Sequence, residues 1–457
     1  MEKTNTIGQN FTTFGLFKFA LPAFFTNVFA QLFKSLDDAL FISRYAGTTA
    51  LAALNILVPL DCIRLALTHL CSLGAATISA KYMGEGKQEE AKQIFTKIVV
   101  VTFVLGSIFG LIINIFSKPI LYLFGADDTL YPLALYQVML VYGISPIVLI
   151  NSVFALYYST AGKPKMGMIC SVVNGVVNVV LDIVLITYMK MGVLGAAIAS
   201  ATGELCVFII GLIFYINKNN EIHFVKPVGE FVKPCIDTFK FGMPQCINSL
   251  SFSVTAFITN NQLLRLAGSD GVAANAIIGD IRSIMLSGLI GISASLGPVI
   301  AFNYGERNVE KLRKTLYSIL KIWFIGSMVL VGIGFILRIP LVKVFMSEDS
   351  SSTFYEMVLL GITIEIFSIP FASGCIITSR MFISLSNTRA STIISVCRNL
   401  IFRAFSLILL PILFGVVGVW SAIPFAEFIA FLFSCLLIYL NRDNYGYGKS
   451  HEAYLVQ

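Results

Sequence analysis

The chain has 457 residues, of which 57% are hydrophobic and only 12% are charged. Ordinary soluble domains carry about 25% charged residues, so a soluble protein of this composition could not cover its surface with polar groups. The same numbers exclude a disordered chain, a coiled coil, a collagen and a disulfide scaffold. What remains is a helical protein that crosses a membrane many times.

Twelve stretches are long and apolar enough to span a membrane, which takes roughly 20 residues per helix. Polar or Gly/Pro-containing segments separate them, such as 84–86 and 162–164. With the N-terminus in the cytoplasm, most Lys and Arg fall in cytoplasmic segments, as the positive-inside rule requires. We therefore predict an all-α, multi-pass protein with both termini cytoplasmic. The expected spans are 14–42, 52–80, 93–117, 131–159, 166–188, 193–216, 238–264, 272–302, 315–338, 353–380, 390–413 and 415–440.

The two halves of the sequence are similar to each other. Residues 80–92 and 301–313 share Ala, Gly, two Glu and a basic residue at an offset of 221. Residues 192–204 and 415–427 share a Gly-Val-x-Gly start and a final Glu at an offset of 223. Each half then has six spans and the same orientation, and such parallel repeats are typical of secondary transporters.

The repeat defines the predicted domains: a six-helix bundle at 1–216, a cytoplasmic linker at 217–240, a second six-helix bundle at 241–440 and a cytoplasmic tail at 441–457. The sequence lacks a G-x-x-x-x-G-K-[ST] motif, so an ATP-driven pump is not indicated. We expect no enzymatic activity and no cofactor apart from a coupling ion.

Ionisable residues inside spans are costly and default to function. Asn174, Asn178 and Asp182 are spaced i, i+4 and i+8, so they share one helix face. One carboxylate with amide oxygens suits a proton or a small hard cation. The alternative, that the Asn side chains only join helices through hydrogen bonds, does not explain Asp182.

Two adjacent acids lie in the first span, Asp37 and Asp38, and they point about 100° apart. We take Asp38 as the functional acid, whereas a structural pair with Lys34 is the alternative. Asp61 and Arg64, at i and i+3, are interpreted as a packed ion pair. The residues predicted to line a substrate cavity are Asn27, Gln31, Asn174 and Glu204, although a structural hydrogen bond explains Glu204 equally well.

The second half differs in its intramembrane charges. Glu427 matches Glu204 in the repeat, but Arg282, Arg398 and Arg403 also lie in spans of this half. These arginines make the second half less suited to binding cations, so the predicted chemistry is asymmetric.

Several motifs occur in a recognisable order: 38–44 (DALFISR), Asn178 to Asp182, 298–305 (PVIAFNYG) and 414–427 (FGVVGVWSAIPFAE). In these the chain resembles the multidrug and toxic compound extrusion (MATE) family, in its bacterial MepA-like group. The resemblance implies two bundles around a V-shaped cavity in a bacterial cytoplasmic membrane. It also implies export of cationic lipophilic compounds driven by Na⁺ or H⁺. The cation site it implies consists of Asp38, Asn178, Asp182 and Ser200, with Thr202 close to Ser200 in the match.

The predicted mechanism is antiport, in which Asp38 and Asp182 share one pocket. A bound H⁺ or Na⁺ and a bound drug would exclude each other from this pocket. We expect no structural metal in addition to this transported ion. The expected partners are small lipophilic cations and membrane lipid, without nucleic acid, and the chain is expected to be a monomer. An alternative is a flippase for a lipid-linked saccharide or another lipid, whose phosphate would suit the arginines. A receptor or scaffold would leave the repeat and the paired Asp residues unexplained.

Overall fold

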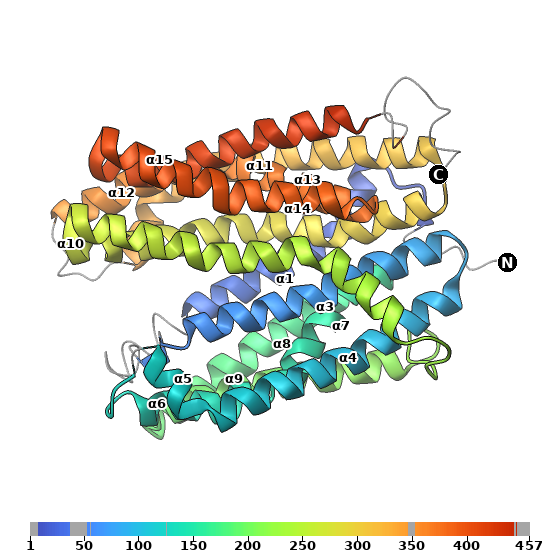
Figure 1. Cartoon of the computed structure of the whole chain (residues 1–457), viewed down its shortest axis with the longest axis horizontal. Coiled ribbons are helices and arrows are strands. Elements are labelled where there is room, and N and C mark those ends of the chain that lie inside the picture. The colour runs from blue at the N-terminus through green and yellow to red at the C-terminus, as the bar shows by residue number, and fades with distance from the viewer. Residues whose placement is uncertain are drawn as a thin grey trace. The chain divides into compact units, whose positions relative to one another are not determined.

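The computed structural model describes residues 8–36, 53–54, 56–124, 126–345, 352–442 and 445. These ranges are helical apart from short connections, and no strand occurs in them (Figure 1). Helices satisfy their own backbone hydrogen bonds, which is what lipid surroundings require of a spanning segment. The predicted all-α class is therefore confirmed. Asp37 and Asp38 lie outside the described residues.

The described chain divides into two compact units. Residues 25–242 belong to the first unit, and residues 8–24 together with the described chain from Met243 onward belong to the second. The first helix, α1 (Thr13–Leu36), is thus divided between the two units. The boundary at Gly242 lies inside helix α10 (Val232–Gly305), so the residues 232–240 of the expected linker are already helical.

The first unit continues from α1 through a series of mostly long helices. Its fourth predicted span is bent by 52° near Gly143 and Ile144, where Pro146 begins the next helix. Its elements after α1 are α3 (Val58–Gly84), α4 (Gln88–Ile115), α5 (Ser117–Leu123), α6 (Tyr131–Gln137), π-helical η3 (Val138–Tyr142), α7 (Ser145–Thr160), α8 (Pro164–Asp182), π-helical η4 (Ile183–Tyr188) and α9 (Gly192–Ile216).

The second unit has the same kind of bend at the matching place of its repeat. Helices α12 and α13 meet at 45°, again just before a proline, Pro370. Glycines with positive φ break two long helices, α10 at Gly268 and α15 at Gly415. After α10 the elements are α11 (Val309–Phe345), α12 (Ser352–Ile366), α13 (Ile369–Ser384), α14 (Thr388–Val396), π-helical η5 (Cys397–Phe402) and α15 (Arg403–Leu440).

These breaks explain how the helices correspond to the predicted spans. Within the described ranges, eight helices have the length and hydropathy of a membrane span, and ten do if each bent pair is one span. The stretch 388–440 is one of these, although Gly415 divides it, and the arm of α10 before Gly268 is not among them. Counting 388–440 as two spans, and adding the arm of α10 before Gly268 as another, raises the ten spans to the twelve that the sequence predicted.

Small residues allow helices of the first unit to approach closely. A Cβ atom on Gly74 of α3 would lie 1.9 Å from the carbonyl oxygen of Thr238, and one on Gly242 would lie 2.2 Å from that of Leu70. Helix α3 therefore packs backbone to backbone against the start of α10. Such contacts suit a membrane interior, where close packing of small residues replaces the hydrophobic effect between helices.

Candidate functional site

Helix α8 carries the polar stripe that the sequence predicted. Its last residue, Asp182, is fully buried, and the chain continues directly into the π-helical segment η4. Such segments are rare and are often found at functional sites, because they turn side chains away from the regular helical register. Asp182 thus lies at a local irregularity within an apolar span, near the end of the span Pro164–Tyr188.

Asn178 and Ser200 are the hydrogen-bonding neighbours that define this end of the site. In the amide orientation that satisfies both neighbours, Asn178 donates from Nδ2 to Asp182 Oδ2 over 3.1 Å. Its Oδ1 accepts from Ser200 Oγ of α9 over 3.3 Å. The structure thus brings three of the four residues of the predicted coupling site together. Thr202 instead donates to the carbonyl of Ile198 in its own helix, at 2.7 Å.

A second polar layer lies one turn earlier along α8. Asn174 donates to Glu204 Oε1 over 3.2 Å, and Asn151 of α7 donates to Glu204 Oε2 over 2.7 Å. Asn151 also donates to the carbonyl oxygen of Glu204 over 2.9 Å. Two neutral amides therefore hold the Glu204 carboxylate. These are the structural hydrogen bonds that the sequence offered as one of two interpretations of Glu204.

Close packing fixes the distance between α8 and α9 at this layer. A Cβ atom on Gly203 would lie 2.3 Å from Asn174 Oδ1 and 3.2 Å from its carbonyl oxygen. Gly175 similarly accommodates the ring of Phe33 from α1, which would lie 1.9 Å from an added Cβ atom. Ser171 donates to the carbonyl oxygen of Thr26 over 2.9 Å, so the polar stripe on α8 continues onto α1.

The remaining predicted residues are placed as follows. Asn27 and Gln31 are partly buried on α1, in the part of that helix that belongs to the first unit. Asp38 lies outside the described residues. The predicted ion pair is confirmed, since Arg64 Nη2 lies 2.8 Å from Asp61 Oδ1. Tyr142 donates to the same oxygen over 2.8 Å, a partner that spacing along the sequence could not identify.

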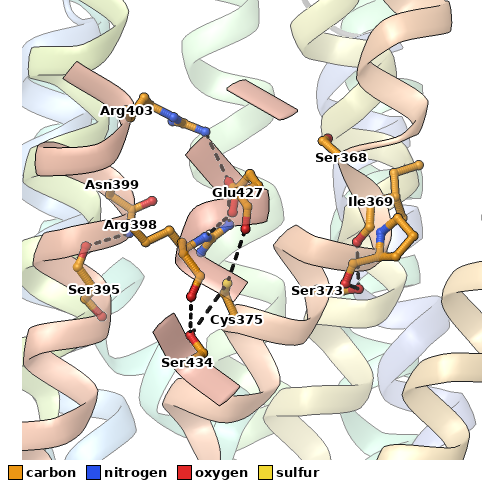
Figure 2. Close-up of polar contacts among 12 residues, drawn as sticks. Ser368, Ile369, Ser373, Cys375, Ser395, Arg398, Asn399, Arg403, Glu427 and Ser434 are labelled. Atoms are coloured by element: carbon orange, nitrogen blue, oxygen red, sulfur yellow. Dashed lines mark hydrogen bonds and ion pairs between the residues drawn. The ribbon is translucent and has the colours of Figure 1, made fainter. Parts of the chain in front are cut away.

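The second unit contains a different polar centre, built on the buried Glu427 of α15 (Figure 2). Arg398 of η5 donates from Nε to Glu427 Oε2 over 2.5 Å and from Nη2 to Oε1 over 3.0 Å. Arg403 reaches Oε1 from 3.4 Å. A bidentate arginine contact is among the strongest polar contacts in proteins.

Arg282 of α10 links this centre to a second buried carboxylate. Its Nη2 lies 3.3 Å from Glu427 Oε1, and its Nε lies 3.1 Å from Glu365 Oε2 of α12. Ser368 donates to the same Glu365 oxygen over 3.2 Å. The three arginines singled out from the sequence therefore share two carboxylates. Glu427 was noted from the sequence, but its pairing with these arginines, and the part played by Glu365, required the structure.

Comparison with known proteins adds the family. The MatE family model matches the chain twice, over residues 22–184 and over residues 244–408, which together are more than half of its length. The chain belongs to the MatE family. The two matches start 222 residues apart, which agrees with the offsets of the internal repeat.

Individual relatives of this MatE-family chain are distant but match it throughout. It is 22% identical to a multidrug export protein MepA from Staphylococcus saprophyticus, over 95% of each chain. It is also 22% identical to the probable multidrug resistance protein YoeA from Bacillus subtilis, over 92% of this chain and 91% of that protein. A crystal structure of MATE in complex with MaL6 superposes with a TM-score of 0.91 at 20% identity, covering 98% of this chain and 100% of that one.

Membership of the MatE family places the chain among multi-pass membrane transporters. Its polar interior is asymmetric, as the sequence predicted. The first unit holds the buried Asp182 and the partly buried Glu204 among amides and a hydroxyl, whereas the second unit buries its carboxylates among guanidinium groups.

Proposed function

We propose that this chain is a secondary active multidrug antiporter that exports cationic lipophilic compounds in exchange for H⁺ or Na⁺. The observation that carries the proposal is the buried Asp182 with Asn178 and Ser200, in a spanning unit of a MatE-family chain. Its support from relatives is that they are named multidrug export and multidrug resistance proteins.

The coupling site would use oxygen atoms that the first unit already gathers. The Asp182 carboxylate, the Asn178 amide oxygen and the Ser200 hydroxyl are hard ligands of the kind that Na⁺ accepts, and the carboxylate alone accepts a proton. In the structure the Asn178 N–H group donates to the Asp182 carboxylate. An entering ion neutralises Asp182 and competes with this hydrogen bond, so loading favours a repacking of α8 against α9.

Export follows if the ion and the drug stabilise different conformations of the first unit, because a ligand shifts an equilibrium only by its differential affinity. We propose Asp38 as the second acid of the coupling site, acting together with Asp182, and we propose that the residues lining the drug cavity are Asn27, Gln31, Asn174 and Glu204. In this proposal the protein works as a monomer in a bacterial plasma membrane, with both termini in the cytoplasm.

The available driving force is sufficient. One charge crossing about 100 mV releases about 2.3 kcal/mol. A tenfold ion gradient adds about 1.4 kcal/mol. For a neutral compound exchanged for one ion, these two contributions together support a concentration ratio of several hundredfold, since each tenfold takes about 1.4 kcal/mol. For a singly charged cation exchanged for one ion, the two charge movements cancel, so a tenfold ion gradient alone supports a ratio of about tenfold.

The test is ethidium efflux from cells that express the chain, with the Na⁺ and the H⁺ gradients collapsed separately. We expect efflux to stop when one of the two gradients is removed and to persist without the other. Efflux that survives loss of both gradients, or no efflux above that of cells with empty vector, would contradict the proposal.

A lipid flippase is the second candidate, and the observations favour it less. The three arginines that the sequence offered to a lipid phosphate are not available to one, because Arg282, Arg398 and Arg403 already bind Glu365 and Glu427. In the same cells, headgroup translocation of a labelled lipid without ethidium efflux would favour the flippase.

A further inference from the structure

A small cavity in the second unit has the composition of an anion site. It has a volume of about 60 Å³ and lies between the two arms of α10, helix α13 and the segment from α14 into η5. Its polar lining comes from Gln245, Asn248, Ser379, Ser395, Arg380 and Arg398, and no acidic side chain of the described chain lines it.

Arg380 is the residue in this cavity whose environment indicates a ligand. Its side chain lines the cavity, and the residue is only 8% exposed. Its Nη1 atom is buried without a hydrogen-bond partner in the described structure. Burying a guanidinium group without a counter-charge is costly in free energy. A cavity beside such a group is therefore expected to bind an anion.

The contrast with the other buried arginines shows that the cation at Arg380 is not accounted for elsewhere. Arg282, Arg398 and Arg403 all contact Glu427, and Arg282 also contacts Glu365. Among the described residues, Arg380 makes no ion pair with either glutamate. Three arginines thus share two carboxylates, and a fourth has none, which leaves an excess of positive charge around the cavity.

We propose that this cavity binds a compact oxyanion, a carboxylate or a phosphate group, with Arg380 as its principal ligand. The planar fork of an arginine matches both groups. Gln245 and Asn248 supply amide N–H groups from the opposite helix. About 60 Å³ is room for a few water molecules, since one needs roughly 10–15 Å³, whereas a drug-sized ligand needs roughly 300 Å³ or more. The site is therefore separate from drug binding and does not depend on the antiport proposal.

The experiment titrates the purified full-length protein in detergent with inorganic phosphate and, in parallel, with acetate, at constant ionic strength. The readout is the midpoint of thermal unfolding, because a ligand that binds only the folded state raises it saturably. Salt effects on protein surfaces are unsaturable and common to all variants. Arg389→Gln, at the exposed second residue of α14, is the matched control.

We expect a saturable rise for the wild type and for Arg389→Gln. In Arg380→Gln the apparent Kd should rise by about tenfold to a hundredfold, the equivalent of losing one hydrogen bond to a charged group. Arg380→Lys, which keeps the charge without the fork, should lie between the two. If Arg380→Gln does not fold, the wild type and Arg380→Lys decide. Equal saturable responses in all folded variants, or none in the wild type with any probe, overturn the proposal.

Two sources of the anion are distinguished by reconstitution into vesicles of phosphatidylcholine with or without phosphatidylglycerol. A rise in the midpoint with phosphatidylglycerol that Arg380→Gln abolishes, without a response to phosphate or acetate, assigns the site to a lipid headgroup. The opposite pattern assigns it to a soluble anion.

Discussion

Glu204 and Glu427 occupy equivalent positions in the two repeats, 223 residues apart, but opposite chemistry holds them. Asn174 donates to Glu204, whereas the residue 224 positions after Asn174 is Arg398, which binds Glu427 through two nitrogen atoms. Both repeats therefore have a helix–helix contact to this carboxylate, but the charge of its partners differs. Neutral amides hold Glu204, whereas positively charged guanidinium groups hold Glu427.

The first prediction concerns this difference. Glu427→Gln removes the carboxylate that three arginines share, and leaves buried cations without compensation. We expect a loss of about 3–5 kcal/mol in the free energy of unfolding. Glu204→Gln keeps an acceptor for one of the amide donors and should cost about 1 kcal/mol. Thermal unfolding of both purified variants measures the difference, and similar losses would show that the charge of the partners does not matter.

The second prediction tests the coupling site. Asp182→Asn keeps the size of the side chain but cannot bind a proton or compensate a cation, so efflux of ethidium should fall to background. Asp237→Asn, at a partly exposed position beside Lys240, is the matched control and should transport normally. Membrane abundance is measured by immunoblot for each variant. Normal efflux by Asp182→Asn at normal abundance would remove Asp182 from the mechanism.

The sequence was sufficient for the fold class because apolar length and the repeat are strong signals. The spacing of Asn174, Asn178 and Asp182 correctly placed them on one face, since the helical period is fixed. The bends before Pro146 and Pro370 lie inside predicted spans, and the span lengths alone did not reveal them. The breaks at Gly268 and Gly415 fall where the sequence separates one predicted span from the next, 238–264 from 272–302 and 390–413 from 415–440.

The partners of the buried charges could not be predicted in the same way. Asn151 and Glu204 form a hydrogen bond although they are 53 positions apart in the sequence, and Arg282 and Glu427 do so although they are 145 positions apart. Such pairs depend on how helices pack, which a single sequence does not encode in its local pattern. The π-helical segments after Asp182 and around Arg398 are also invisible in hydropathy, because they change the register without changing the composition.

The third prediction concerns the contact between α8 and α9. In Gly203→Ala the new methyl group would meet Asn174 at 2.3 Å, so α9 or the Asn174 side chain must move. We expect a loss of about 1–3 kcal/mol in the free energy of unfolding. Transport should weaken too, because the layer beside the coupling site shifts. Gly332→Ala in α11, where an added Cβ has no neighbour within 4 Å, should be neutral or slightly stabilising in the same unfolding and efflux measurements.

The last prediction concerns the break in α15. Gly415 has φ of 57° and ψ of −134°, a conformation that residues with a Cβ atom rarely adopt, although nothing lies within 4 Å of its added Cβ. The strain in Gly415→Ala is therefore purely conformational, and we expect about 1–3 kcal/mol of destabilisation. Gly279→Ala, which has equally open surroundings in the helical part of α10, should not destabilise the protein. Thermal unfolding of the pair separates backbone strain from crowding, and equal midpoints would mean that α15 straightens through position 415 at no cost.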